Sequence, residues 1–220
     1  MPVTKEFKTI EEQIAGLENR NLKFKNKEKA AEILKRYNYF DVINGFETIL
    51  LKGNTAQKEY DNVYFEDFRD LYFFDMKLKQ YTLFKVFDIE SRLRTSIAYN
   101  FASVYCKLGL EDADIFEQAL YVLKEVRNQC AHLELITRFR LKRKSSLNNL
   151  NDITEKAGLS YGKLNYMDVV KIFRLFENIV DLKRVIAVFY LKMLIKGRKK
   201  IADKALSKMG RKKFSVWMKI

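Results

Sequence analysis

Histidine, proline and cysteine are all scarce in this sequence, and these scarcities exclude whole classes of protein. The chain of 220 residues contains one histidine, His132, one proline, Pro2, and two cysteines, Cys106 and Cys130. The cysteines form no CxxC or Cys/His pattern, so neither a disulfide framework nor a zinc site is indicated. We therefore expect no metal and no other cofactor.

Segments that would enter or cross a membrane are absent as well. No run of about 18 uncharged apolar residues occurs, and the first ten residues, MPVTKEFKTI, lack the apolar core of a secretory signal. We therefore expect a cytoplasmic protein that makes no contact with a membrane.

What the sequence does contain predicts an all-α fold. Its 48% apolar and 14% aromatic residues are too many for a disordered chain. One proline and eight glycines leave few helix breakers, and Leu, Lys, Glu and Phe recur every three or four residues. The predicted helices cover residues 5–20, 27–51, 66–80, 83–108, 115–139 and 166–195.

Several local signals refine this pattern. Thr9 and Glu12 have the spacing of a capping box at the first helix, and Gly45 marks a close contact or a break in the second. Residues 52–62 are polar and typical of an exposed loop, whereas residues 66–80 and 83–108 resemble a helical hairpin. We expect one helical domain over residues 1–195 and a basic helical tail over residues 196–220.

The formal charge of +14 makes nucleic acid the leading partner class, because lysines and arginines that neutralise phosphates release counterions. From Lys192 to Ile220 there are eleven Lys or Arg and one acidic residue, Asp203, so this segment supplies +10 of the total. An acidic membrane surface, or a basic surface that serves only solubility, is an alternative explanation.

The only histidine lies in the sequence VRNQCAHLE, residues 126–134. Imidazole both accepts and donates protons near neutral pH, so acid–base catalysis of the usual kind would depend on His132. The alternative is a histidine with no role, but the full pattern Arg-Asn-x-x-x-His occurs by chance only about once in several hundred such chains.

Helix geometry divides this motif between two sides. Five residues turn an α-helix by about 140°, which separates Arg127 from His132, whereas Asn128 and His132 share a face. Two such helices related by a two-fold axis would bring two histidines and two arginines to one phosphate, so the motif predicts a homodimer.

These residue types fit cleavage of RNA without a metal. Histidine would move protons, arginine would hold the phosphate, and asparagine would orient the imidazole or the phosphate. The economical reaction is attack of a 2′-hydroxyl on its own 3′-phosphate, which leaves a 2′,3′-cyclic phosphate and a 5′-hydroxyl end.

RNQCAH resembles the Arg-x4–6-His motif of HEPN-domain ribonucleases, in the form carried by Abi-like (abortive infection, Abi-2) bacterial proteins. Three further blocks resemble this family in order and spacing: KTIEEQIAGLENRNL (8–22), NYFDVINGF (38–46), and YFEDFRDLYFFDMKLK (64–79) with FDIESRLRTSIAYNF (87–101). The resemblance covers roughly residues 5–140.

The resemblance implies a HEPN-like helical bundle with additional N-terminal helices, homodimerisation through the motif helices, and RNA cleavage in antiphage or toxin–antitoxin defence. It also implies that a small structured RNA restrains the protein. Arg127, Asn128 and His132 match the motif, and Arg138 matches an arginine that commonly follows it.

Two sets of residues complete the predicted site. Glu90 and Arg94 either form an ordinary pair one helical turn apart or support the motif arginine from a neighbouring helix. The basic residues expected to contact RNA are Arg140, Lys142, Arg143, Lys144, Arg198, Lys199, Lys200, Arg211, Lys212 and Lys213. The tail could instead be solvated, or could lie on a partner through Leu206, Phe214 and Trp217.

Two other functions are left open by the sequence. A non-catalytic RNA-binding module would use the same groove for recognition alone. A basic helical protein of the membrane surface would account for the tail but not for the motif.

Overall fold

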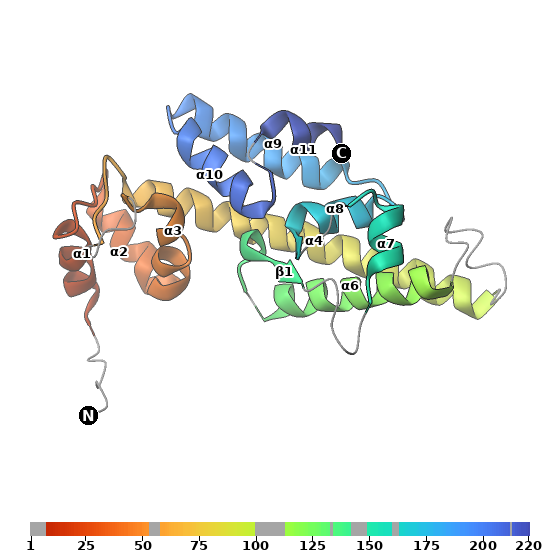
Figure 1. The fold of residues 1–220 in the computed structure, drawn as a ribbon. Helices are drawn as coiled ribbons and strands as arrows, with labels where there is room; N and C mark the ends of the chain where they lie inside the picture. The colour runs from red at the N-terminus through yellow and green to blue at the C-terminus, as the bar shows by residue number, and fades with distance from the viewer. Residues whose placement is uncertain are drawn as a thin grey trace. The chain divides into compact units, whose positions relative to one another are not determined.

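The chain is helical and divides into two compact units, Met1–Phe73 and Phe74–Ile220 (Figure 1). The computed structural model describes residues 8–52, 58–99, 113–132, 134–141, 149–159, 163–211 and 213–220. The all-α prediction is confirmed: helices dominate the described residues, which contain a single small sheet of two short strands. The predicted boundary at residue 195 stays a prediction.

The first unit contains α1 (Ile10–Glu18), α2 (Lys27–Arg36), a π-helix η1 (Phe40–Asn44), α3 (Glu47–Leu50) and the beginning of α4 (Phe65–Tyr99). The predicted capping box is confirmed, because the Thr9 hydroxyl accepts from the Glu12 amide at 3.2 Å and the Glu12 carboxylate accepts from the Thr9 amide at 2.8 Å. Two acceptors thereby satisfy amides that the first helical turn leaves unpaired.

The single helix predicted over residues 27–51 is wrong. It ends at Arg36, because Tyr37 is extended and the Asn38 side chain accepts from the Phe40 amide at 2.9 Å. A short polar side chain that bonds its own backbone competes with helix continuation. At Gly45, where a close contact or a break was predicted, η1 ends, and α3 begins at Glu47; Gly45 itself keeps right-handed helical angles.

A buried carboxylate organises the first unit. Glu47 accepts from Arg20 at 2.8 Å, from Lys58 at 2.7 Å and from the Tyr60 hydroxyl at 3.2 Å. Burial raises the pKa of Glu47, but Lys58 and Arg20 outweigh burial and lower it below its usual value. Tyr60 is only 3% exposed, so the predicted exposed loop over 52–62 is partly wrong; residues 53–57 lie outside the described part of the chain.

Helix α4 runs without a break from Phe65 to Tyr99, so the hairpin predicted between residues 80 and 83 is wrong. Residues 81 and 82 include no glycine or proline, and the Thr82 hydroxyl bonds the Leu78 carbonyl at 2.7 Å, as threonine does within a helix. The same hydroxyl lies 2.7 Å from the buried Tyr166 hydroxyl, which joins α4 to the core of the second unit. Residues 100–108 of the predicted helix lie outside the described residues.

The second unit packs its helices around the later part of α4. They are α6 (Ala113–Ala131), the 3-10 turn η2 (Ile136–Arg138), α7 (Asn151–Lys156), α8 (Tyr166–Phe173), α9 (Val180–Ile195), α10 (Lys199–Met209) and α11 (Phe214–Lys219). Strands β1 (Arg140–Leu141) and β2 (Leu164–Asn165) pair antiparallel, with Arg140 opposite Asn165. In the part of the chain that is described, no helix is long and apolar enough to cross a membrane.

Two predicted helices of this unit have different bounds. The helix predicted over 115–139 ends at Ala131, and the chain continues through η2 into β1. The helix predicted over 166–195 is two helices, because residues 174–179 leave the helical path and the Asn178 side chain caps the Val180 amide at 2.7 Å. Apolar residues keep their helical spacing past the end of α6 and across the break between α8 and α9. Periodicity therefore did not reveal where these helices end.

The basic tail folds onto the second unit. Trp217 is 1% exposed and its indole donates to the Arg211 carbonyl at 2.8 Å, while Phe214 stacks on Tyr190 with ring centroids 4.3 Å apart. Gly210, between α10 and α11, has φ +138° and lies so close to Asn165 that a Cβ would be 2.1 Å from its side-chain oxygen. Any side chain at Gly210 would therefore disturb the start of α8.

A second buried carboxylate, Asp75 on α4, holds the segment after α6. It is 0% exposed, accepts from the Thr137 amide at 2.8 Å and lies 3.3 Å from the Lys79 ammonium. Burial raises the pKa of Asp75, against the opposing effects of Lys79 and Thr137. The carboxylate is thus part of the core.

Replacing Asp75 by alanine should destabilise the chain by about 3–5 kcal/mol, because the buried Lys79 would lose its carboxylate and the buried Thr137 amide would lose its acceptor. Asp88→Ala is the matched control. It removes the i,i+4 pair between Asp88 and Arg92 on α4, in which the two groups lie 3.7 Å apart and both side chains are about half exposed. That loss should be about 0.5 kcal/mol or less. Urea unfolding followed by circular dichroism measures both, and equal losses would contradict the role assigned to Asp75.

Candidate functional site

The motif residues occupy the last two turns of α6. Val126 and Cys130 lie on the side of the helix that faces the core, and they are 0% and 5% exposed. The helix ends at Ala131, but the His132 amide still donates to the Asn128 carbonyl at 2.9 Å. Asn128 and His132 therefore keep the i,i+4 relation that the sequence predicted.

Arg127 is held by a carboxylate from the neighbouring helix. Its guanidinium lies 3.3 and 3.5 Å from the two carboxylate oxygens of Glu90 on α4, and its side chain stays 40% exposed. Of the two alternatives for Glu90, contact with the motif arginine is the one observed. Arg94 is exposed one turn further along α4. A carboxylate that fixes one side of a guanidinium leaves its other N–H groups available to a phosphate.

His132 projects from a different side of α6. It is exposed, whereas Asn128 is half-buried. Five residues of helix separate Arg127 from His132 by about 140°, so one chain presents the guanidinium and the imidazole on different sides.

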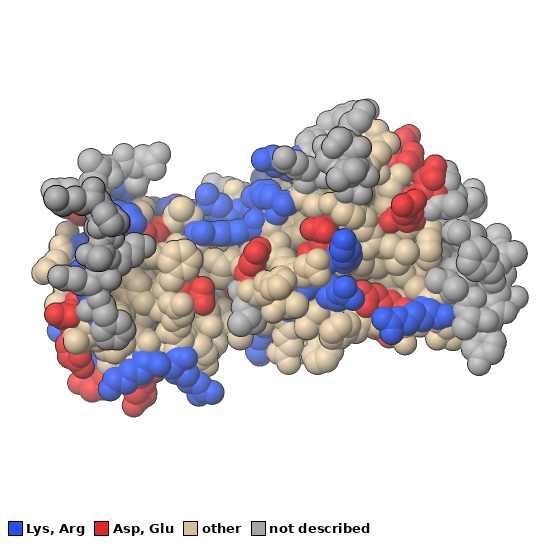
Figure 2. All heavy atoms as spheres, turned by 90° about the horizontal axis from the view of Figure 1, so that it is seen from below, with Lys and Arg blue, Asp and Glu red and all other residues tan. Residues whose placement is uncertain are grey.

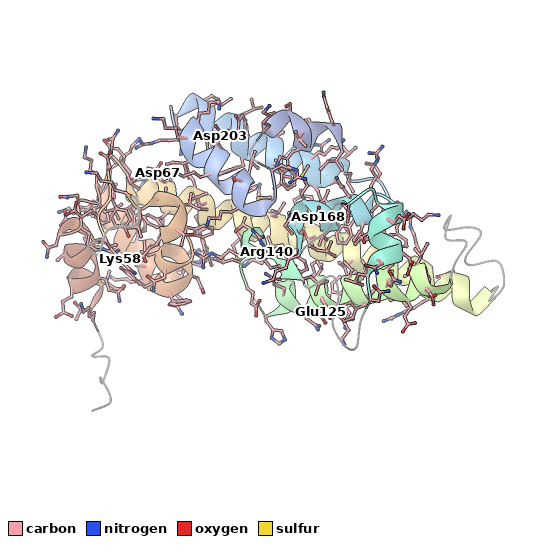
Figure 3. All side chains as sticks on the ribbon, in the orientation of Figure 1. Lys58, Asp67, Glu125, Arg140, Asp168 and Asp203 are labelled. Carbon is pink, nitrogen blue, oxygen red and sulfur yellow. The ribbon has the colours of Figure 1, made fainter. Side chains whose placement is uncertain are left out.

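The segment after the motif is fixed to the core. Arg138 ends η2, where burial lowers its pKa while the charge of Asp75 acts in the opposite direction. Arg140, labelled in Figure 3, donates to the carbonyls of Phe139 at 2.5 Å and of Lys208 at 2.6 Å, so the backbone uses two of its N–H groups. Lys142, Arg143 and Lys144 lie outside the described residues.

The basic residues of the tail differ in their availability. The Lys199 ammonium lies 2.6 Å from Asp203, and Arg211 donates to the Gly210 carbonyl at 3.2 Å. Lys200 and Lys213 are exposed, Arg198 is half-buried, and Lys212 lies outside the described residues.

The three apolar residues of the tail that could have lain on a partner pack against the chain itself. Leu206 is 0% exposed, and Phe214 and Trp217 pack within the chain as described above. The alternative in which these three residues lie on a partner is therefore wrong. On the face shown in Figure 2, acidic and basic side chains are interspersed, so the positive charge is not gathered into one patch there.

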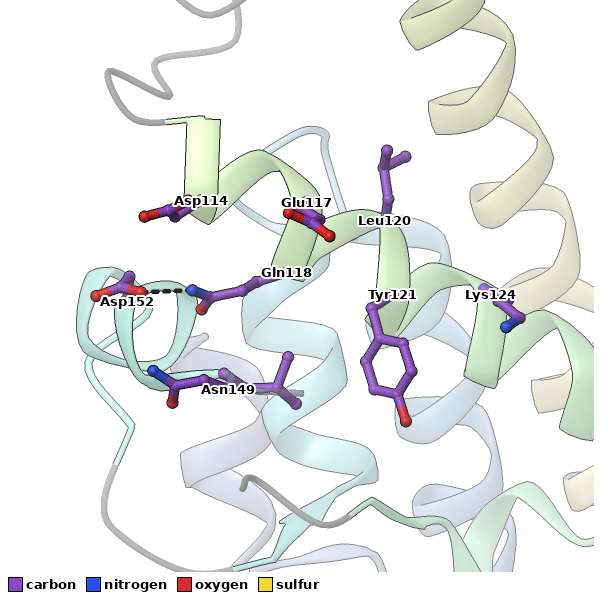
Figure 4. A pocket seen from close by; sticks show the side chains of 9 residues that line it. Asp114, Glu117, Gln118, Leu120, Tyr121, Lys124, Asn149 and Asp152 are labelled. Atoms are coloured by element: carbon purple, nitrogen blue, oxygen red, sulfur yellow. Dashed lines mark hydrogen bonds between the residues drawn. The ribbon is translucent and has the colours of Figure 1, made fainter. Parts of the chain in front are cut away.

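A hollow of about 480 Å³ lies between the first half of α6 and α7 (Figure 4). Asp114, Glu117 and Asp152 give it an acidic character. Gln118 donates to Asp152 and accepts from the Ile153 amide at 3.0 Å, so its side chain is already used. Among the described residues, no three His, Cys, Asp or Glu side chains are grouped as metal ligands would be. An acidic lining disfavours RNA phosphates.

Residues 32–116 match the family model described as Abi-like protein. The match extends from α2 through α4 into the first turn of α6, so it ends before Arg127. It supports the Abi-like resemblance and, in general terms, a part in abortive-infection defence. No curated protein and no solved structure shows a significant match to the chain.

Cys130, inside the motif, is a structural residue. Burial raises the pKa of its thiol to about 12, although the Lys79 charge acts in the opposite direction. At pH 8 only about one thiol in ten thousand would be ionised, and the thiolate is the reactive form. Cys130 is therefore unsuited to act as a nucleophile.

In a Cys106→Ser chain, Cys130 should resist a thiol-specific reagent such as DTNB at pH 8 and should react promptly in urea. The reason is that both burial and the raised thiol pKa must be removed before reaction. Absorbance of the released chromophore measures the rate, and prompt reaction of one thiol per folded chain would show that the site is open.

Proposed function

We propose that this chain is a metal-independent endoribonuclease of bacterial abortive-infection or toxin–antitoxin defence, of the HEPN type. The observation that carries the proposal is the pair between Arg127 and Glu90, at 3.3 Å. It sets a partly exposed guanidinium on the motif helix, in a chain whose preceding residues match the Abi-like family. An arginine held in this way is pre-organised for a phosphate.

The chemistry follows from the residues of the motif. A 2′-hydroxyl of RNA attacks the adjacent phosphorus, the bond from phosphorus to the 5′-oxygen breaks, and a 2′,3′-cyclic phosphate and a 5′-hydroxyl are formed. One imidazole accepts the proton of the 2′-hydroxyl and another donates a proton to the leaving 5′-oxygen. Arg127 balances the negative charge that develops on the phosphate.

A homodimer would supply the second imidazole. Helix α4 exposes Phe84 by 61% and Phe87 by 50%, and α6 exposes Leu120 by 36%. Phe87 lies about one helical turn before Glu90, on nearly the same side of α4 as the carboxylate that contacts Arg127. Large exposed apolar side chains next to a charged pair favour a contact between chains at this face. Such a contact would bring two motifs together.

A non-catalytic RNA-binding module is the second candidate. It is favoured by the separation of Arg127 from His132 on one chain, because a protein that only binds RNA needs no pairing of the two. Cleavage distinguishes the candidates, since only the enzyme requires the imidazole.

His132→Ala should lower RNA cleavage by about 10²- to 10⁴-fold and leave RNA affinity nearly unchanged, because the imidazole moves protons rather than holding the strand. Wild-type and variant chains are expressed in bacteria, and growth and 5′-hydroxyl ends of cellular RNA are measured. Lys124→Ala, an exposed change one turn before Arg127, is the control and should behave as wild type. If His132→Ala chains still arrest growth and cut RNA, the ribonuclease proposal fails.

Phe87→Glu should convert the homodimer to a monomer and abolish cleavage, because a carboxylate on this face would be desolvated without a partner. Light scattering after size-exclusion chromatography gives the mass of each chain. The matched control is Val188→Glu on α9, which changes a side chain of similar exposure, 58%, elsewhere in the same unit. A dimer that survives Phe87→Glu but not Val188→Glu would place the interface on α9.

A further inference from the structure

A basic hollow lies among α7, α8 and α11 in the second unit. It has a volume of about 440 Å³, within the range of about 300–1,000 Å³ typical of small-molecule sites. Its apolar lining comes from Ala157, Met167, Leu175, Val216 and Ile220. Its basic lining comes from Lys156, Lys171, Arg174 and Lys219. None of these residues belongs to α6, so the hollow is distinct from the motif.

No acidic side chain in the described part of the chain pairs with the four cations of this hollow. No carboxylate side chain lines the hollow, and within the described residues no hydrogen bond or ion pair joins any of the four side chains to an acidic group. Four ammonium and guanidinium groups around about 440 Å³ repel one another, and a bound anion would remove that repulsion. The hollow is therefore suited to a ligand with more than one negative charge.

A second hollow, of about 530 Å³, continues from the first and shares Arg174, Leu175 and Ile220 with it. It adds a half-buried aromatic ring, Phe176. The one carboxylate side chain in the described lining of the two hollows is Glu177, and it is already bound, at 3.2 Å by Lys85 and at 3.4 Å by Arg92. The second hollow therefore places an aromatic ring and several apolar side chains beside two cations, Arg174 and Lys183.

We propose that these two hollows form a nucleotide-binding groove, in which phosphates contact Lys171 and Arg174 and the adjoining base stacks on Phe176. A nucleotide matches both hollows. It carries a negatively charged phosphate and, joined to it through a sugar, a flat base that can stack on an aromatic ring. Arginine and lysine hold phosphates by charge and hydrogen bonds, and an aromatic ring accepts any base. The ligand is a unit of a single RNA strand, which the groove would hold without cutting it.

Binding of a fluorescent single-stranded DNA oligonucleotide tests the groove without depending on cleavage, because DNA has no 2′-hydroxyl. In wild type, the slope of log affinity against log salt reports the number of phosphates contacted. Lys171→Glu with Arg174→Glu should weaken binding by on the order of 10- to 100-fold and reduce the slope by about 1.4, the value for two lost contacts with a single strand. Phe176→Ala should weaken binding by about 5-fold or more.

The matched control is Lys29→Glu with Lys35→Glu on α2, where two exposed lysines lie in the first unit. It changes the net charge by the same amount, so equal weakening by both pairs would overturn the proposal in favour of a diffuse positive field. Lys171→Gln with Arg174→Gln repeats the test without new negative charges, and thermal unfolding by circular dichroism shows that each variant is folded. Unchanged affinity in this folded pair would also overturn the proposal.

Two competitors identify the source of the phosphate. If a nucleoside monophosphate displaces the oligonucleotide from wild type, a single nucleotide is enough to fill the groove. If inorganic phosphate and the monophosphate both fail while a longer unlabelled strand competes, the groove requires a strand. Sedimentation with anionic phosphatidylserine vesicles that depends on Lys171 and Arg174, with no oligonucleotide binding, would show a membrane surface and overturn the proposal.

Discussion

A buried carboxylate on α4, Asp75, fixes the position of the chain after the motif helix. Its hydrogen bond with the Thr137 amide and its pair with Lys79 are inside the core, where an unsatisfied charge would be costly. This requirement holds η2 against α4 and so limits where α6 can end. His132, one residue beyond α6, takes its place between a helix packed through Val126 and a segment anchored at Thr137.

The sequence predicted local features of the chain better than the ends of its helices. The capping box at Thr9 was identified because it depends on two residues three positions apart, which is local information. The division of residues 166–195 was missed because apolar residues recur through it, although Asn178 caps the second helix locally. The continuity of α4 was missed because a contact with a distant residue helps to hold its middle in the core. Thr82 meets Tyr166 from 84 positions away in the sequence, and no local pattern contains that contact.

The candidate site shows the same division between local and distant information. The spacing of Arg127, Asn128 and His132 fixes their angles around α6, and the observed helix keeps those angles. The sequence left two roles open for Glu90. An acidic residue one turn before Arg94 could pair with Arg94, and it could equally well support Arg127. Only the packing of α4 against α6 separates the two, since it brings the Glu90 carboxylate to the guanidinium of Arg127.

Net charge is a poor guide to which cations can bind a partner. The tail from Lys192 to Ile220 carries most of the excess charge, yet Lys199 is paired with Asp203, and Leu206 and Trp217 are buried in the core of the second unit. A folded tail can present only the cations that its own carboxylates and carbonyls leave available. Lys171, on α8, and Arg174, directly after it, were not among the basic residues predicted to contact RNA, yet they line a hollow without a carboxylate side chain. The physically relevant quantity for phosphate binding is therefore the number of unpaired cations that converge, and convergence is a property of the fold.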